Sequence, residues 1–439
     1  MHKSNFISVV SWVPKGASKE VPNKLQMSQD EIQMKIEQQK ELMKEMDLEE
    51  MEDDSETGKE NADIADNDDA IIDRYNLNDY DDDGEGDDLT LNHSELVVFP
   101  DNNQDPYLNN EENFSDDEEE NDDFRIKPTD NLILAGHILE DSVSLEVSVY
   151  NRQGDFYVHH EIYLGAFPLC FEWLDYLDGS QKGNLVAIGD MKNDINVWDI
   201  DTVNVIDPKF SLSGHSDSVL GLSLNKINRK ILASVSADKT CKLWDLETKT
   251  STQTFESFKG IVTSSSFHPF EENILLVGDA KGKASLIDIK SGSVKKWNIC
   301  RDDIEKVLWN KYNPYTFLCG TSTGSVISID CRNENAHHLT LKAHNESISG
   351  MELSHLCKGC LVTSCEKVVK IWDLCENEVK FIKETDPQVG TILSLSANPD
   401  LPFVFAISGD NNAENLKIVD ISEFKQVKNH FSDFISSTN

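Results

Sequence analysis

Basic residues are scarce in this sequence relative to acidic ones: 40 Lys and Arg stand against 80 Asp and Glu among 439 residues. The imbalance is concentrated between Asp47 and Asp123, where 32 acidic residues accompany only Lys59 and Arg74. A field of this sign repels phosphate backbones, which argues against a direct nucleic-acid site, and it attracts basic proteins. We therefore expect basic protein partners, such as ribosomal proteins, assembly proteins or histones.

Long apolar runs are also missing. No stretch approaches the roughly 18 apolar residues of a membrane-spanning helix, and the opening "MHKSNFISVVSWVPKG" lacks the apolar region of a secretory signal. The nine cysteines are odd in number and follow no disulfide spacing. These absences predict a protein with no membrane partner that works in a reducing compartment.

A short pattern recurs through the second half of the chain, in which hydrophobic alternation ends in Asp, as in "CKLWD" and "VKIWD". The steps between successive Asp residues are 46, 43, 42, 43 and 47 residues. A degenerate seventh copy, "LEVSVYN", ends at Asn151. This period is typical of WD repeats, each of which supplies a four-stranded blade, so the sequence predicts an all-β, seven-bladed WD-repeat β-propeller. The six Asp residues are Asp199, Asp245, Asp288, Asp330, Asp373 and Asp420.

The first blade is predicted to be split. It lacks an inner strand just upstream of "NLILAGHI", whereas "ISVVSWV" at Ile7–Val13 resembles the inner strands of other blades. We therefore expect Ile7–Val13 to complete the first blade, with everything between forming one insertion. The last blade is expected to end with "VKNHFSDF" (Val427–Phe434) as a strand beside the first blade, which closes the ring and removes exposed sheet edges.

The insertion has two parts. Ser28 and Glu31 form a capping-box pattern, and helical spacing of apolar residues predicts a short helix over about 29–46. The acidic run that follows has the composition of a largely disordered segment. The expected parts of the chain are an N-terminal strand (1–14), a capped helical segment (15–46), an acidic low-complexity insertion (47–123) and the propeller (124–439).

His215, Ser234 and Asp238 stand in the best-preserved repeat, which ends at Trp244. Their residue types are those of a hydrolase triad, but Ser234 lies in the middle of a predicted strand and has no Gly-x-Ser-x-Gly elbow to expose it. WD blades use the same four residue types as a buried structural network. We favour that interpretation and expect no catalytic, cofactor-binding or metal-binding residues.

Other repeats keep parts of this network. One begins with Ala343-His344 and contains Thr363, but its turn carries Glu366 one residue too early for the tetrad spacing, so a complete network is doubtful there. Such decay is expected of a scaffold and would be unusual for repeated copies of an active site. The residues assigned to partial networks are Trp198, Asp199, His344, Thr363, Trp372 and Asp373.

Three other patterns contain residue types that can form a site. Cys357 and Cys360 form a Cys-x₂-Cys pair without a second pair, which favours a turn leading into a strand over a zinc site. His159 and His160 lie on a predicted outer strand, where neighbours should face opposite sides. Ser115 precedes five acidic residues and is a candidate phosphosite for an acidophilic kinase.

Several stretches outside the repeat pattern resemble the periodic tryptophan protein 1 family of WD-repeat proteins. They include "SVVSWVPKGASKEVPNKLQMSQDEI", "FRIKPTDNLILAGH", "FYVHHEI", "FHPFE", "AHNESISGMELS" and "NPDLPFVFA", and all seven Trp fall on predicted strands. The resemblance implies a nuclear and nucleolar protein linked to ribosomal RNA production and large-subunit assembly. It also implies chromatin and histone contacts for some members. This chain lacks an extended basic C-terminal tail, so the resemblance does not extend to nucleic-acid binding through such a tail.

Two functions remain open at this level. In the first, the protein is a non-catalytic scaffold in ribosome biogenesis, acting in rRNA processing or large-subunit assembly, as a monomer within a pre-ribosomal particle. In the second, it is a chromatin- or histone-binding regulator of ribosomal gene transcription. An enzymatic function is disfavoured because the sequence shows no group of polar residues outside the blade network that could form an active site.

Overall fold

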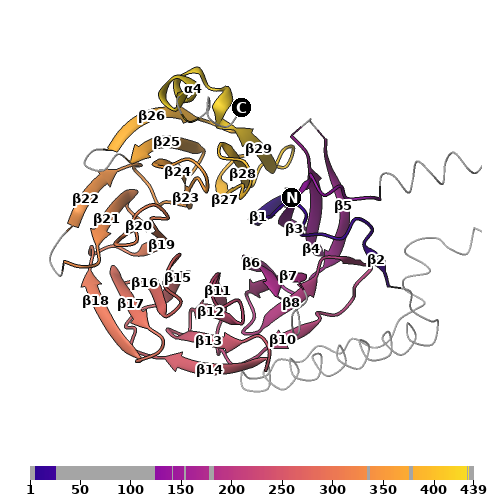
Figure 1. The fold of residues 1–439 in the computed structure, drawn as a ribbon, viewed down its shortest axis with the longest axis horizontal. Helices are drawn as coiled ribbons and strands as arrows, with labels where there is room; N and C mark the ends of the chain where they lie inside the picture. The colour runs from indigo at the N-terminus through magenta and orange to yellow at the C-terminus, as the bar shows by residue number, and fades with distance from the viewer. Residues whose placement is uncertain are drawn as a thin grey trace, which may run out of the picture. The chain divides into compact units, whose positions relative to one another are not determined.

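Seven antiparallel sheets surround a central axis, as Figure 1 shows. The computed structural model describes residues 5–25, 124–140, 142–152, 155–176, 182–333, 337–374, 379–432 and 434. Within these residues the chain forms a seven-bladed β-propeller, which confirms the fold class that the repeat predicted. The helix expected over 29–46, the acidic run and the candidate phosphosite Ser115 lie outside the described residues.

The first three blades follow one another around the ring, each with four strands counted from the axis outward. Blade 1 contains β1 (Asn5–Val13), β3 (Asn131–Leu139), β4 (Ser142–Tyr150) and β5 (Phe156–Tyr163). Blade 2 contains β6 (Pro168–Tyr176), β7 (Lys182–Asp190), β8 (Ile195–Asp199) and β10 (Phe210–Leu212). Blade 3 contains β11 (Val219–Leu224), β12 (Ile231–Ser236), β13 (Cys241–Asp245) and β14 (Thr250–Phe255).

Blades 4 to 6 repeat this layout, and blade 7 has three strands. Blade 4 contains β15 (Val262–Phe267), β16 (Ile274–Asp279), β17 (Lys283–Asp288) and β18 (Ser293–Asn298). Blade 5 contains β19 (Ile304–Trp309), β20 (Thr316–Thr321), β21 (Ser325–Asp330) and β22 (His337–Lys342). Blade 6 contains β23 (Gly350–Leu353), β24 (Cys360–Cys365), β25 (Val368–Leu374) and β26 (Val379–Thr385), and blade 7 contains β27 (Ile392–Ala397), β28 (Val404–Gly409) and β29 (Leu416–Asp420).

The N-terminal strand β1 closes the ring. It pairs with β3 within blade 1, and it also contacts β27 and β28 of blade 7 and β6 of blade 2. Trp12 Nε1 donates to the carbonyl of Ser396 at 3.1 Å, and the Lys15 amide donates to Asp400 Oδ2 at 2.8 Å. Because these bonds join the first strand to the last blade, they close the ring of blades.

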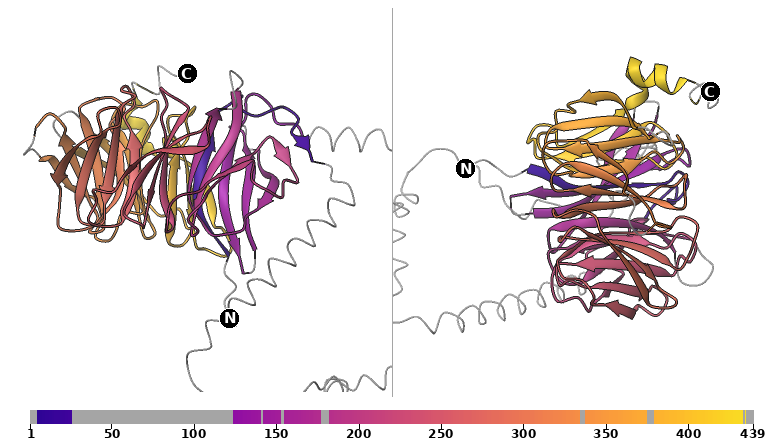
Figure 2. Two further views of the ribbon diagram at one scale, coloured as in Figure 1. Left: turned by 90° about the horizontal axis from the view of Figure 1, so that it is seen from below. Right: turned by 90° about the vertical axis from the view of Figure 1, so that its left-hand side faces the viewer.

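The prediction for the last strand is wrong. "VKNHFSDF" forms a helix, α4 (Lys425–His430), after a 3₁₀ turn at Ile421–Glu423 that Asp420 caps. Val427, Phe431 and Phe434 recur at steps of four and three, which is a helical period, and they pack against Phe403. The views in Figure 2 show α4 at the rim, where it contacts β26.

The insertion leaves blade 1 through an ordered corner. β2 (Asn23–Lys24) pairs in parallel with β9 (Thr202–Val203), which lies in the connection between β8 and β10 of blade 2. Lys24 Nζ lies 4.4 Å from the centre of the Phe124 ring. Both ends of the insertion are therefore anchored at the outer side of the propeller. Of the helices in the described part of the chain, none has the length and apolar character needed to cross a bilayer.

Candidate functional site

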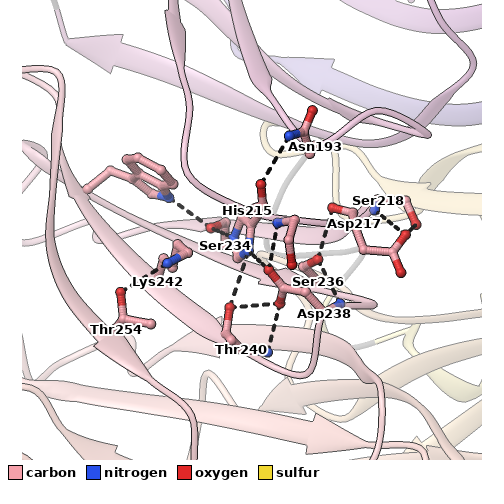
Figure 3. Close-up of polar contacts among 12 residues, drawn as sticks. Asn193, His215, Asp217, Ser218, Ser234, Ser236, Asp238, Thr240, Lys242 and Thr254 are labelled. Carbon is pink, nitrogen blue, oxygen red and sulfur yellow. Dashed lines mark hydrogen bonds and ion pairs between the residues drawn. The ribbon is translucent and has the colours of Figure 1, made fainter.

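The structure brings the four residues of the best-preserved repeat together in blade 3, as Figure 3 shows for the labelled members. Trp244 Nε1 donates to Ser234 Oγ at 2.8 Å, and Ser234 Oγ lies 2.7 Å from His215 Nε2. His215 Nδ1 in turn lies 2.7 Å from Asp238 Oδ2. Leu232 pairs with Trp244 on the neighbouring strand. Ser234 lies two residues beyond Leu232, so its side chain points to the same face of the sheet. The register of the two strands therefore places the serine beside the indole.

One protonation state of His215 gives every donor in this series of hydrogen bonds an acceptor. With the proton on Nδ1, His215 donates to Asp238 and accepts from Ser234, which accepts from Trp244. Burial lowers the pKa of His215, partly offset by the hydrogen bond to Asp238, so the neutral ring is favoured. Burial alone would raise the pKa of Asp238, but hydrogen bonds from Thr240, His215 and the Ser216 amide outweigh it and bring that pKa to about 2.

The hydrogen bonds run from serine to histidine to aspartate, as in a hydrolase triad, yet Ser234 cannot reach a substrate. Ser234 is fully buried, and its oxygen already receives the Trp244 N–H. A nucleophile needs an exposed oxygen and room for a carbonyl beside it. The geometry therefore supports a structural network that satisfies buried polar groups inside a thin blade.

Blade 6 retains three of the four members. Trp372 Nε1 donates to Thr363 Oγ1 at 3.0 Å, and that oxygen lies 2.8 Å from His344 Nε2. The turn acid Glu366 is exposed, and among the described residues no carboxylate hydrogen-bonds to His344. Burial, with a further contribution from nearby Lys370, lowers the pKa of His344 to about 4.

Blade 2 retains only the tryptophan. The position two residues beyond the partner of Trp198 is Ile188, which has no hydroxyl. The Trp198 Nε1 is accordingly buried without a hydrogen-bond partner among the described residues. The neighbouring Asp199 lies outside this network and accepts from the Asp201 amide at 3.1 Å and from Lys209 at 2.9 Å.

Asp373 has a different role from the one expected. Its carboxylate lies 2.8 Å from His430 Nε2, so it fixes the last residue of α4 against blade 6. The aspartate that follows the repeated tryptophan is therefore an anchor for the C-terminal helix.

The expectation that His159 and His160 face opposite sides is wrong. β5 carries a bulge at this point: Val147 pairs with His160 and Ser148 with Val158, which leaves His159 as the extra residue. The two Nδ1 atoms lie 2.9 Å apart. Burial, with a smaller contribution from His159, lowers the pKa of His160 to about 4.

Cys357 and Cys360 flank the turn that leads into β24, where both are buried and free. Within the described ranges, no group of three or more His, Cys, Asp or Glu side chains is arranged to hold a metal ion.

A second set of polar residues, which the sequence analysis missed, fixes the turns between the first and second strands of blades 3 to 7. We call them the turn caps. The Asn225 side chain accepts from the amides of Ile227 and Asn228, and His268 Nδ1 accepts from those of Phe270 and Glu271. The others act in the same way, and the turn caps are Asn225, His268, Asn310, Ser354 and Asn398.

Three of the turn caps also tie their own blade to the next one. Asn225 Nδ2 donates to the carbonyl of Glu272 at 2.6 Å, and Ser354 Oγ donates to that of Pro402 at 2.6 Å. His268 Nδ1 accepts within its turn, so Nε2 carries the hydrogen and donates to the carbonyl of Pro314 at 2.8 Å. The five turn caps follow one another at steps of 42 to 44 residues, and this spacing is the signal that could have found them in the sequence.

The capped turns hold apolar side chains out toward solvent. Exposed large side chains stand on the turns of four consecutive blades: Ile227 (46% exposed), Phe270 (58%), Tyr315 (46%) and Leu356 (45%). Because the main chain beneath them is fixed by hydrogen bonds, little conformational entropy would be lost on contact with a partner. We call these four residues the turn crescent.

Comparisons with known proteins agree with this geometry. The family model "WD domain, G-beta repeat" matches residues 206–245, which contain the network of blade 3. A "Periodic tryptophan protein 1 homolog" of Drosophila melanogaster is 33% identical over 92% of each chain. "Periodic tryptophan protein 1" of Saccharomyces cerevisiae is 31% identical over 97% of this chain and 90% of its own. An uncharacterized WD repeat-containing protein of Schizosaccharomyces pombe is 28% identical over 98% of this chain and 92% of its own.

All seven tryptophans lie on strands of the ring, in β1, β6, β8, β13, β18, β19 and β25. The similarity to the fly and yeast proteins covers nearly the whole of each chain. The chain therefore belongs to the periodic tryptophan protein 1 family of WD-repeat proteins.

Proposed function

We propose that this protein is a non-catalytic scaffold of ribosome biogenesis that works in the nucleolus, within particles that mature into the large ribosomal subunit. The propeller supplies rigid protein-binding faces, and the acidic run engages basic ribosomal or assembly proteins. Family membership supports the process, and the buried serine of the blade network supports a role without catalysis.

The turn crescent is the observation that carries the scaffold role. Monomeric proteins expose single apolar residues at many places, but here four neighbouring blades each present one from the equivalent turn. Aromatic and large aliphatic side chains on a rigid base are the usual anchors of protein interfaces. We infer that a protein component of the particle docks on this face.

The acidic run supports the second contact. Its 32 carboxylates against two basic residues attract positively charged proteins, and this attraction weakens as salt screens it. Two contacts of different chemistry on one chain would raise the overall affinity for a particle that carries both ligands.

Affinity purification of the tagged chain at moderate salt tests the proposal. We expect large-subunit proteins and precursor ribosomal RNA to co-purify. The double variant Phe270→Ser, Leu356→Ser should recover at least tenfold less of these proteins and this RNA than the unchanged protein does. Met191→Ser, which removes an exposed apolar side chain from the turn between β7 and β8, is the matched control and should lose none.

Recovery of core histones in place of large-subunit proteins would favour the chromatin-binding alternative, which rests on the same acidic run. Recovery of neither class would contradict the proposal.

A further inference from the structure

Among the described residues, blade 7 lacks the outer strand that the other six blades have. Six blades contain four strands, whereas β27, β28 and β29 form a three-stranded sheet. In the first six blades the third strand is covered by a fourth. In blade 7 the third strand, β29, has no described strand on its outer side.

The burial of the third strands shows the effect of this absence. β8, β13, β17, β21 and β25 each contain at least three buried residues. None of the five residues of β29 is buried, and all are partly exposed. Since the other third strands occupy the same place in their blades, the missing fourth strand accounts for the difference.

The hydrophobic core shows the same gap. In each complete blade, the outer strand adds an apolar side chain to a core cluster: Ile162, Leu212, Phe255, Trp297, Leu341 and Ile382. The cluster between blades 7 and 1 contains Trp12, Val404 and their neighbours, with Leu416 and Ile418 of β29 only partly covered. Among the described residues, no outer-strand side chain joins this cluster.

Two main-chain bonds determine which groups of β29 face outward. The Ile421 amide donates to the carbonyl of Phe403, and the carbonyl of Asn415 accepts from Gly409, so odd-numbered residues here turn toward β28. Strand alternation then points the N–H and C=O groups of Leu416, Ile418 and Asp420 away from β28. This edge has the hydrogen-bonding pattern that another strand requires.

The continuing chain is used elsewhere. After Asp420 it forms the 3₁₀ turn and α4, with Val427 fully buried and His430 bonded to Asp373 in blade 6. The stretch that a regular blade would use as its outer strand is thus held in a helix against β26 (Figure 1).

We propose that blade 7 is completed by an extended segment of a second protein, which pairs antiparallel with β29 as the fourth strand does in the other six blades. Its alternate side chains are apolar, because one face must cover Leu416 and Ile418. Its end beside Asp420 is basic, because Asp420 is the last residue of β29 and Glu423 follows it, whereas Glu414 at the other end is already paired with Lys417. This surface is separate from the turn crescent and does not depend on it.

Selection from a random 12-residue peptide library displayed on phage, with the full-length protein as the target, tests the proposal. The key variant is Ile418→Pro, because proline removes an outward N–H while the bonds of Lys417 and Val419 to β28 remain. Ile418→Ala is the matched control, since it loses the same side chain and keeps the N–H. Equal melting temperatures of the two variants establish that they fold alike.

We expect the enriched peptides to alternate apolar residues, to carry Lys or Arg at the end that pairs beside Asp420, and to bind Ile418→Ala at least tenfold more tightly than Ile418→Pro. They should also slow hydrogen exchange at the amides of Leu416, Ile418 and Asp420. Peptides that bind both variants equally, that protect other amides, or that fail to enrich overturn the proposal.

Discussion

Replacing Asp238 by Ala is the sharpest test of the blade network. The carboxylate accepts from His215 Nδ1 at 2.7 Å, from the Thr240 hydroxyl and amide at 2.7 and 2.8 Å, and from the Ser216 amide at 3.1 Å. Water can replace the carboxylate at Ser216, which is exposed, and in part at Thr240. The His215 side chain is fully buried, and its N–H would keep only the longer contact to the Thr240 hydroxyl, 3.2 Å from Nδ1, in place of the carboxylate. A buried donor that loses its charged acceptor costs about 1–3 kcal/mol, and the lost bonds to Thr240 and Ser216 add to this, so we expect a total loss of about 3 kcal/mol.

Urea unfolding at pH 7 measures this loss, and Asp217→Ala is the control. Asp217 is exposed in the same loop, and its carboxylate accepts only local bonds from Ser218. Its main-chain carbonyl, which accepts from Ser236, is kept in the variant, so the replacement should change the unfolding free energy by less than about 0.5 kcal/mol. Because the folded-state pKa of Asp238 is about 2, its contribution is complete above the ordinary aspartate value near 3.9 and is lost as pH falls through about 2. Equal stabilities of the two variants at pH 7 would refute the network.

Three further predictions concern the ring. Deletion of residues 1–13 removes β1 and should lower the melting temperature of the whole propeller, whereas deletion of 47–90 should leave it unchanged; equal melting temperatures would contradict this. Trp198→Phe removes an unpaired N–H and should cost at least about 1 kcal/mol less than Trp244→Phe, as measured by urea unfolding. The neutral form of His344 is favoured in the fold, with a pKa of about 4, so its contribution should be lost as pH falls from about 6.5 toward 4; His344→Gln should flatten the dependence of stability on pH in that window, and an unchanged slope would count against it.

The repeat was readable in the sequence because its signal is local. The Asp residues mark the ends of third strands, and alternation within each strand determines which side chains face the core, so period and register gave the ring and the blade 3 network together. The split first blade was also predictable, since an unpaired inner strand had one candidate upstream.

The C-terminal helix, the bulge in β5 and the turn caps were not predicted from the sequence, because they depend on contacts that the local pattern does not show. "VKNHFSDF" has both strand-like composition and helical spacing, and packing of Val427 and Phe431 against Phe403 decides for the helix. The bulge at His159 inserts one residue, and nothing in the local pattern marks it. The turn caps are of three residue types, Asn, His and Ser, that share only a hydrogen-bond acceptor, so a search for identical letters does not find them.

The split first blade also has a consequence for synthesis. β1 leaves the ribosome first, but Val13 pairs with Leu132 of β3, which follows more than a hundred residues later. At the usual translation rates of about 5–20 residues per second, β1 waits roughly 6–24 s for its partner. Most of the intervening stretch is the acidic run, and repulsion among its carboxylates disfavours collapse of the waiting chain onto its neighbours. Closure against β27 and β28 comes later still, so the earliest strand to be made is among the last to be enclosed.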